Sequence, residues 1–229
     1  MPSKNRIKQY VEDGYYHVYN RGVEKRVTFL DEKDYVVFLY LLKLYLLPLS
    51  DNTPKTLSNL QYARIRKTFF GEIELHSFCL MPNHFHLLIH QTNRDSITNF
   101  MRALITSYVM YFNKRYKRVG SLFQGNYKAV LVTSDPYILH LTRYIHCNPR
   151  SLSAGSDPAA LESYPYSSYS YYMGKKHANW VKTDFIFSLL GNEENDIEKQ
   201  IISYKEFLEE YAYELDDLPD KLLLENPDD

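Results

Sequence analysis

The chain has 229 residues, 45% of them hydrophobic and 15% aromatic, which is enough to bury the core of one sizeable domain. Its two cysteines, Cys79 and Cys147, exclude a disulfide framework and predict a reducing, intracellular location. The most apolar run, Tyr35 to Leu47, contains Lys43 and is too short to span a bilayer. Residues 1–14 are polar and charged, so we expect neither a membrane span nor a secretory leader.

The net charge of −1 hides a strong asymmetry along the chain. Residues 1–150 hold 21 Lys and Arg against 11 Asp and Glu, a net of +10, whereas residues 151–229 hold 6 against 17, a net of −11. A basic body followed by an acidic extension favours a protein that binds a polyanion with its first two-thirds. The alternative is that these cations simply solvate an ordinary surface. The change of character predicts a functional domain over 1–150 and a C-terminal extension over 151–229.

The first part of the chain predicts a strand and a helix. Residues 15–19 are aromatic and β-branched, as in a strand, and the Asn-Arg-Gly turn at 20–22 ends them. Asp31 can cap a helix that is apolar nearly all round and stops before Pro48. A polar connection is expected over 49–68.

The next two segments predict a β-hairpin. Residues 72–80 alternate between apolar and polar side chains, Pro82-Asn83 is turn chemistry, and residues 84–91 alternate again. Successive side chains of a strand point to opposite faces, so one face of the second strand is apolar and the other carries imidazoles. The apolar face holds Phe85, Leu87 and Ile89, and the opposite face holds His84, His86, Leu88 and His90.

A second helix should start at Asp95 or Ser96 and end in a basic run at 114–118, and a fourth strand is expected over 126–133. Ser134-Asp135-Pro136 then starts a third helix that runs to about Cys147. The order β-α-β-β-α-β predicts an α+β fold of the split βαβ, ferredoxin-like type, an antiparallel sheet with helices on one face. The C-terminal extension is expected to hold a tyrosine-rich segment and then helices over 180–190 and 197–213.

Two imidazoles two residues apart on one strand suit two ligands of one metal ion. The first alternative is that His84 and His86 only form hydrogen bonds at a sheet surface. A second alternative is a zinc site that adds Cys79 or Cys147, because thiolate and imidazole together favour zinc.

The third predicted helix supplies a tyrosine and an asparagine on one face. Tyr144 and Asn148 are four residues apart, so they lie one above the other. If this helix lies against the sheet, the Asn148 amide oxygen can be a third metal ligand and the Tyr144 phenol a nucleophile toward a phosphodiester. The alternative is a core tyrosine followed by an asparagine that caps the helix.

The chain resembles the single-tyrosine HUH transposases, and specifically the REP-associated tyrosine transposases. The resemblance runs from about Tyr15 to Tyr172 and rests on five blocks in the right order. These blocks are YHVYNRG at 16–22, CLMPNHFHLL at 79–88, LFQGNYK at 122–128, RYIHCNP at 143–149 and YPYSSY at 164–169.

The resemblance implies that His84, His86 and Asn148 bind Mg²⁺ or Mn²⁺ and that Tyr144 is the nucleophile. It implies an enzyme that cuts and rejoins single-stranded DNA bearing hairpin (REP-like) elements, through a 5′-phosphotyrosine that leaves a free 3′-OH. It leaves open whether the protein is a monomer or a homodimer, and whether it moves DNA or serves its host. A cytoplasmic, nucleoid-associated location is expected.

Basic side chains near the predicted site are candidates for DNA contacts. These candidates are Arg21, Lys114, Arg115, Lys117, Arg118, Lys128 and Arg143. One rival function is a non-catalytic module on the same fold that binds hairpin DNA or RNA. Another is a replication initiator or relaxase with the same site chemistry, although the helicase or primase parts usual in those proteins are missing here.

Overall fold

The computed structural model describes residues 10–49, 67–152, 158–191 and 196–209. Within these residues four strands form a single antiparallel sheet in the order β2-β3-β1-β4. The strands are β1 (Gly14–Arg21), β2 (Ile73–Met81), β3 (His84–Gln91) and β4 (Lys128–Val132). The predicted α+β, split βαβ fold is therefore confirmed, and β3, which carries the histidines, lies inside the sheet. The expectations for residues 1–9 and for most of the 49–68 connection fall outside the described residues.

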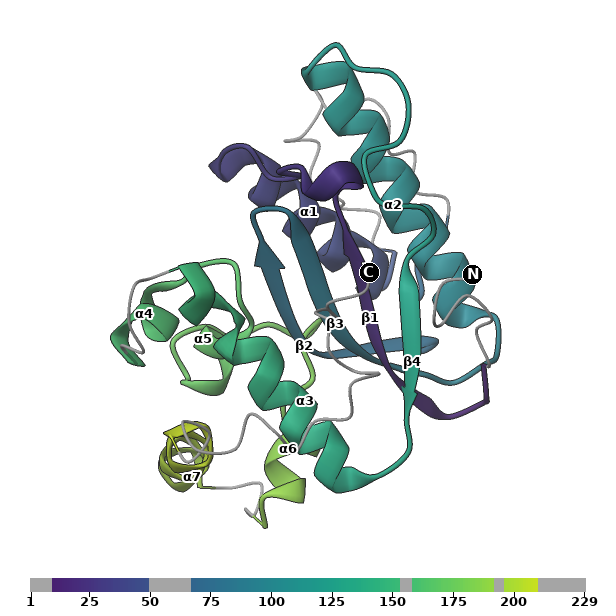
Figure 1. Ribbon diagram of the computed structural model, residues 1–229. Coiled ribbons are helices and arrows are strands. Elements are labelled where there is room, and N and C mark those ends of the chain that lie inside the picture. Colours follow the sequence, from purple (N-terminus) through teal and green to yellow (C-terminus); the bar gives the residue numbers. More distant parts are fainter. Residues whose placement is uncertain (1–9, 50–66, 153–157, 192–195, 210–229) are drawn as a thin grey trace, which may run out of the picture.

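Helices lie on both faces of this sheet (Figure 1). The three longest that contact it are α1 (Glu32–Leu46), α2 (Ser96–Arg115) and α3 (Asp135–Cys147). α1 and α2 cover the face that carries Phe85, Leu87 and Ile89, as the alternation of β3 predicted. α3 covers the opposite face, where its Leu141 and Ile145 belong to the same apolar cluster as Leu88. The expected layer on one face thus holds for α1 and α2, whereas the apolar stripe of α3 is buried on the second face.

Local signals account for where these helices begin and end. The Asp31 side chain accepts a hydrogen bond of 3.3 Å from the Asp34 amide, which caps α1. In α3, Pro136 occupies the first turn, where its missing N–H costs nothing. Pro149 follows Asn148 directly, and the chain continues as a short 3-10 turn, η3 (Asn148–Leu152). A second such turn, η1 (Val23–Lys25), follows β1.

The C-terminal extension packs along the edge of β2 and onto α3. Its helices are α4 (Pro158–Ser163), α5 (Tyr169–Tyr172), α6 (Asp184–Leu189) and α7 (Ile197–Glu209). The Leu80 amide donates to the Tyr166 carbonyl, and the Ser168 amide donates to the Phe78 carbonyl, both at 2.9 Å. The YPYSSY block therefore covers the hydrogen-bonding edge of β2.

The helix predicted over 180–190 was too long at its start. Trp180 stacks on Phe78 at 5.6 Å, and the Lys182 amide donates to the Leu75 carbonyl at 2.8 Å. These contacts hold the first residues of the segment in a turn and a bend beside β2, so α6 begins only at Asp184. Of the helices in the described ranges, none is both long and apolar enough to cross a membrane.

Candidate active site

His84 meets Asn148 on the α3 face of the sheet. The Asn83 side-chain nitrogen donates to the Lys25 carbonyl at 3.1 Å, so its oxygen faces His84 Nδ1 at 2.7 Å. That oxygen only accepts, so the His84 proton is on Nδ1. Burial lowers the pKa of His84 to about 4, with a smaller lowering by the Arg21 charge, so the imidazole is neutral and Nε2 keeps a lone pair.

This lone pair points at a second acceptor. The Asn148 side-chain nitrogen donates to the Tyr144 carbonyl at 3.1 Å, which turns the amide oxygen toward His84 Nε2 at 3.4 Å. With the proton of His84 on Nδ1, no proton lies between these two acceptors. Adjacent ligands of an octahedral Mg²⁺ are roughly 3 Å apart, so the pair has the spacing of two ligands of one cation.

His86 is fully buried beside a histidine of the neighbouring strand. Its Nδ1 lies 2.8 Å from Nε2 of His17 on β1, and both side chains are 0% exposed. Burial, helped by the nearby His17, His84 and Arg21, holds the pKa of His86 well below its usual value. Its other nitrogen, Nε2, is buried and forms no hydrogen bond within the described part of the chain. A buried nitrogen with no partner is costly unless something else binds it.

Tyr144 lies on α3 one turn before Asn148 and is half-buried. Its ring centroid is 5.3 Å from that of His86, at an interplanar angle of 87°. The structure thus brings together all four residues that the sequence singled out for chemistry. Two elements supply them: β3 holds the two histidines, and α3 holds Tyr144 and ends at its C-terminal cap, Asn148.

The donor set fits a divalent cation that takes nitrogen and oxygen ligands. An imidazole nitrogen of His84 and the Asn148 amide oxygen lie 3.4 Å apart, and the His86 ring, with its unpartnered buried nitrogen, lies 5.1 Å from the His84 ring between centroids. The zinc alternative would need a thiolate beside the histidines, whereas burial raises the pKa of Cys147 to about 11 and that of Cys79 further, so both thiols are protonated in the metal-free protein. In the ranges that the structure describes, no group of three or more His, Cys, Asp and Glu is arranged to hold a metal ion.

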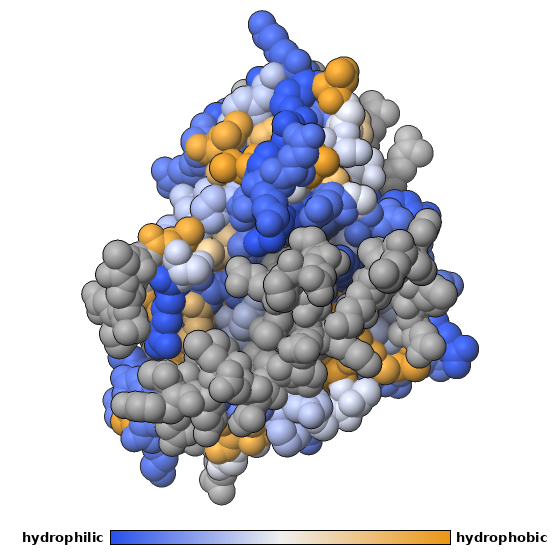
Figure 2. Space-filling model, in the orientation of Figure 1, coloured by the Kyte–Doolittle hydropathy of each residue, from blue (hydrophilic) through white to orange (hydrophobic). Residues whose placement is uncertain are grey.

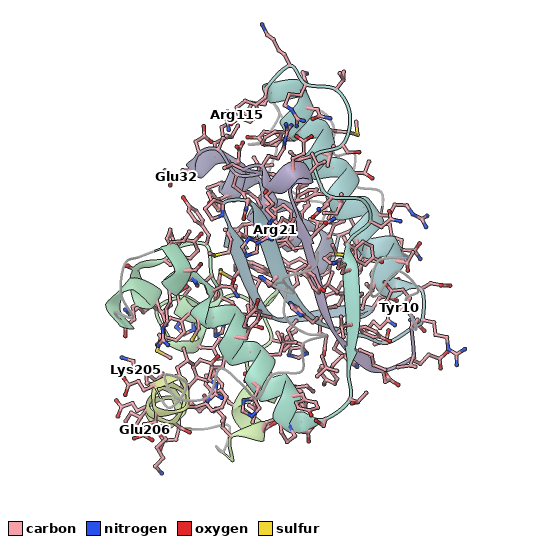
Figure 3. All side chains as sticks on the ribbon, viewed as in Figure 1. Tyr10, Arg21, Glu32, Arg115, Lys205 and Glu206 are labelled. Atoms are coloured by element: carbon pink, nitrogen blue, oxygen red, sulfur yellow. The ribbon has the colours of Figure 1, made fainter. Side chains whose placement is uncertain are left out.

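Two of the basic candidates flank the histidines. Arg21 pairs with His84 in the β1–β3 register, and its Nε is buried without a hydrogen bond among the described residues. Lys128 pairs with Tyr19 across β1 and β4 and lies 5.9 Å from the centre of the Tyr19 ring. Figure 3 shows Arg21 over the central strands.

Two other candidates have their guanidinium groups engaged by residues of the protein itself. Arg143 is only 2% exposed, and its guanidinium lies 4.6 Å from the Phe207 ring of α7. Arg115 pairs with Asp31 at 2.5 Å and with the fully buried Asp34 at 2.6 Å, which ties the end of α2 to the start of α1 (Figure 3). We therefore propose that neither of them contacts DNA.

The remaining candidates gather at the C-terminal end of α2. Lys114 and Lys117 are exposed there, and Arg118 is half-buried. The space-filling view shows mainly hydrophilic residues at this end of the molecule (Figure 2).

His17 was missed by reasoning from the sequence. It faces the site because Tyr15, His17, Tyr19 and Arg21 alternate along β1 with the core residues Tyr16 and Val18. The alternation could have found it, but only with the β1–β3 pairing known, because His17 contacts a residue 69 positions away.

Comparisons with known proteins agree with this description. Residues 61–148 match the model of the family described as "Transposase IS200 like". No curated protein matches the chain. A solved structure of a REP-associated tyrosine transposase bound to a REP hairpin has the same fold, with a TM-score of 0.52 and 11% identity over 79% of this chain and 98% of that one.

A crystal structure of a Deinococcus radiodurans R1 protein has a TM-score of 0.35 and 16% identity, over 63% of this chain and 95% of its own. That TM-score is too low to indicate a shared fold. The family match spans both site histidines, the tyrosine and the asparagine. Over residues 61–148, the chain is therefore similar to the IS200-like transposase family.

Proposed function

We propose that this chain cuts and rejoins hairpin-bearing single-stranded DNA through a covalent 5′-phosphotyrosine on Tyr144, with Mg²⁺ or Mn²⁺. The observation that carries the proposal is the meeting of α3 with β3. The Tyr144 ring lies 5.3 Å from His86, and the Asn148 oxygen lies 3.4 Å from His84. A nucleophile beside a set of cation ligands is what phosphoryl transfer to a side chain requires.

The cation would be held by Nε2 of His84, Nε2 of His86 and the side-chain oxygen of Asn148. When bound, such an ion polarises a phosphoryl oxygen and stabilises the negative charge that develops on it. Asn83 keeps His84 Nε2 deprotonated, and His17 orients His86 through Nδ1. The Tyr144 carbonyl turns the Asn148 oxygen inward.

In the cleavage step the Tyr144 oxygen bonds to phosphorus and the bond from phosphorus to the 3′ oxygen breaks. The phenol loses its proton, and the leaving 3′ oxygen ends as a hydroxyl. One phosphodiester replaces another, so the bond energy is kept and a 3′-OH can later attack the phosphotyrosine to rejoin strands.

Recognition of DNA would use cations on both sides of the site. Arg21 and Lys128 flank the histidines, and Lys114, Lys117 and Arg118 form a basic end on α2. The solved transposase that shares the fold holds a REP hairpin, which supports a hairpin as the partner here. We place the activity in residues 1–150, in the cytoplasm at the nucleoid.

A strand-polarity assay tests the proposal. Single-stranded DNA with the hairpin and flanks found beside the gene is labelled at either end and incubated with protein and Mn²⁺. We expect the 3′ label, but not the 5′ label, to migrate with the protein on a denaturing gel. The adduct should vanish with chelator and in Tyr144→Phe, which should still bind the DNA.

Two results would contradict the proposal. An adduct that keeps the 5′ label would mean the opposite linkage. Hairpin binding with no adduct in Mn²⁺ or Mg²⁺ would favour the non-catalytic hairpin-binding module.

A further inference from the structure

α3 is held from the side that faces away from Tyr144. At about 100° per residue, His146 lies roughly 200° around the helix from Tyr144. His146 is 0% exposed, and both ring nitrogens have partners. Nε2 lies 2.6 Å from the Ser168 hydroxyl, and Nδ1 lies 2.5 Å from the hydroxyl of Tyr204 on α7.

One assignment of protons satisfies every group in this network. A neutral imidazole has one donor and one acceptor, and each nitrogen of the buried His146 ring faces one hydroxyl. Tyr204 donates to Nδ1, and Nε2 donates to Ser168. Ser168 then donates to the Phe78 carbonyl at 3.2 Å and also accepts from the Phe78 amide at 2.8 Å. A fully satisfied buried network specifies one arrangement of the elements that it joins.

A second contact joins the same two helices. The Arg143 guanidinium donates to the Phe207 carbonyl at 3.2 Å and to His140 Nδ1 at 2.7 Å. α7 therefore forms hydrogen bonds with α3 at residues 143 and 146, which lie on either side of Tyr144 in the sequence. In Figure 1, α7 lies beside α3 on the side away from the sheet.

We infer that the C-terminal extension sets the position of the nucleophile, with Ser168, Tyr204 and His146 as positioning residues for Tyr144. This inference rests on the proposed function. The network ties α3 to the backbone of β2 at Phe78, one strand away from the histidines of β3. The extension thus fixes both the rotation of α3 and its height over the sheet. An error of about 1 Å in the placement of a reacting group can cost about 100-fold in rate.

The test compares two tyrosines of one cluster. Tyr204→Phe removes the hydroxyl that binds His146. Tyr172→Phe is the matched control, because Tyr172 is also 0% exposed and donates to the His76 carbonyl at 2.9 Å, which is not part of α3. Each variant loses one buried hydrogen bond and keeps its ring. Both should melt at similar, slightly lowered temperatures.

We expect Tyr204→Phe to slow single-turnover adduct formation by about 10- to 100-fold, with hairpin affinity within about twofold of wild type. Amides 138–147 of α3 should exchange hydrogen faster. Tyr172→Phe should keep both the wild-type rate and the α3 protection. Equal adduct rates in the two variants would overturn the inference and leave the proposed function intact. A wild-type protein that forms no adduct would contradict both the proposed function and this inference.

Discussion

The two faces of the sheet carry opposite kinds of side chain, although the same strands supply both. Toward α1 and α2, β3 presents Phe85, Leu87 and Ile89, all 0% exposed in one apolar cluster. Toward α3 it presents His84 and His86 beside a phenol and an amide. The packed face fixes the backbone, and the rigid backbone can then hold neutral imidazoles out of water on the other face.

This contrast predicts that neighbouring residues of β3 fail in different ways. Leu87→Ala should lower the free energy of unfolding by about 2–5 kcal/mol, because it opens a cavity in the core. His84→Ala should cost much less stability, since His84 is only half-buried. It should instead abolish the rise in melting temperature that Mn²⁺ gives the wild-type protein.

Thermal melts with and without Mn²⁺ measure both effects, with chelated protein as the control. A His84→Ala protein that Mn²⁺ stabilises as much as wild type would contradict the assigned ligand set.

The buried histidines also predict how stability depends on pH. The pKa of His76 is lowered to about 4 and that of His146 to about 3, chiefly by burial, against an ordinary value near 6.5. The unfolded chain therefore binds more protons than the folded one in this window. Stability should be fully present above pH 6.5 and fall as the pH drops toward 4, by up to about 1.4 kcal/mol per pH unit for each histidine.

Urea unfolding of metal-free protein between pH 4 and 7 measures this fall. A His76→Gln variant should show a shallower slope. A flat profile for the wild-type protein would contradict the burial of neutral imidazoles on the α3 face.

The smallest expected effects are on DNA binding, and they distinguish a cation at the end of α2 that contacts DNA from one that does not. Lys117→Ala should weaken hairpin binding modestly and reduce the slope of log affinity against log salt by about 1, as the loss of one phosphate contact would. Arg115→Ala should leave that slope unchanged and lower stability, because Asp34 would keep a buried carboxylate without its cation.

Affinity titrations at several salt concentrations compare the two variants. A lower slope in Arg115→Ala would restore Arg115 to the set of DNA contacts.

The parts of the site that the sequence predicted rest on local geometry. Strand alternation put His84 and His86 on one face, and the spacing of four residues put Tyr144 above Asn148. Features that depend on contacts between residues far apart in the sequence could not be predicted from strand alternation or helix spacing. The burial of Arg143 depends on α7, the pairing of Arg115 depends on α1, and the late start of α6 depends on the edge of β2.

The resemblance to a known family supplied the roles of the site residues, which neither alternation nor spacing gives alone. His17 shows the same division, since its place on β1 was evident but its partner was not.

Tyr144 is the residue to which we expect the DNA to be covalently attached. Trypsin cuts after Arg143 and Arg150, and the resulting peptide, residues 144–150, contains a single tyrosine. We would trap the adduct, digest both protein and DNA, and determine the mass of this peptide. We expect a peptide heavier by a 5′-linked nucleotide. An unmodified peptide 144–150, with the nucleotide on another tyrosine, would contradict the assignment of Tyr144 as the nucleophile.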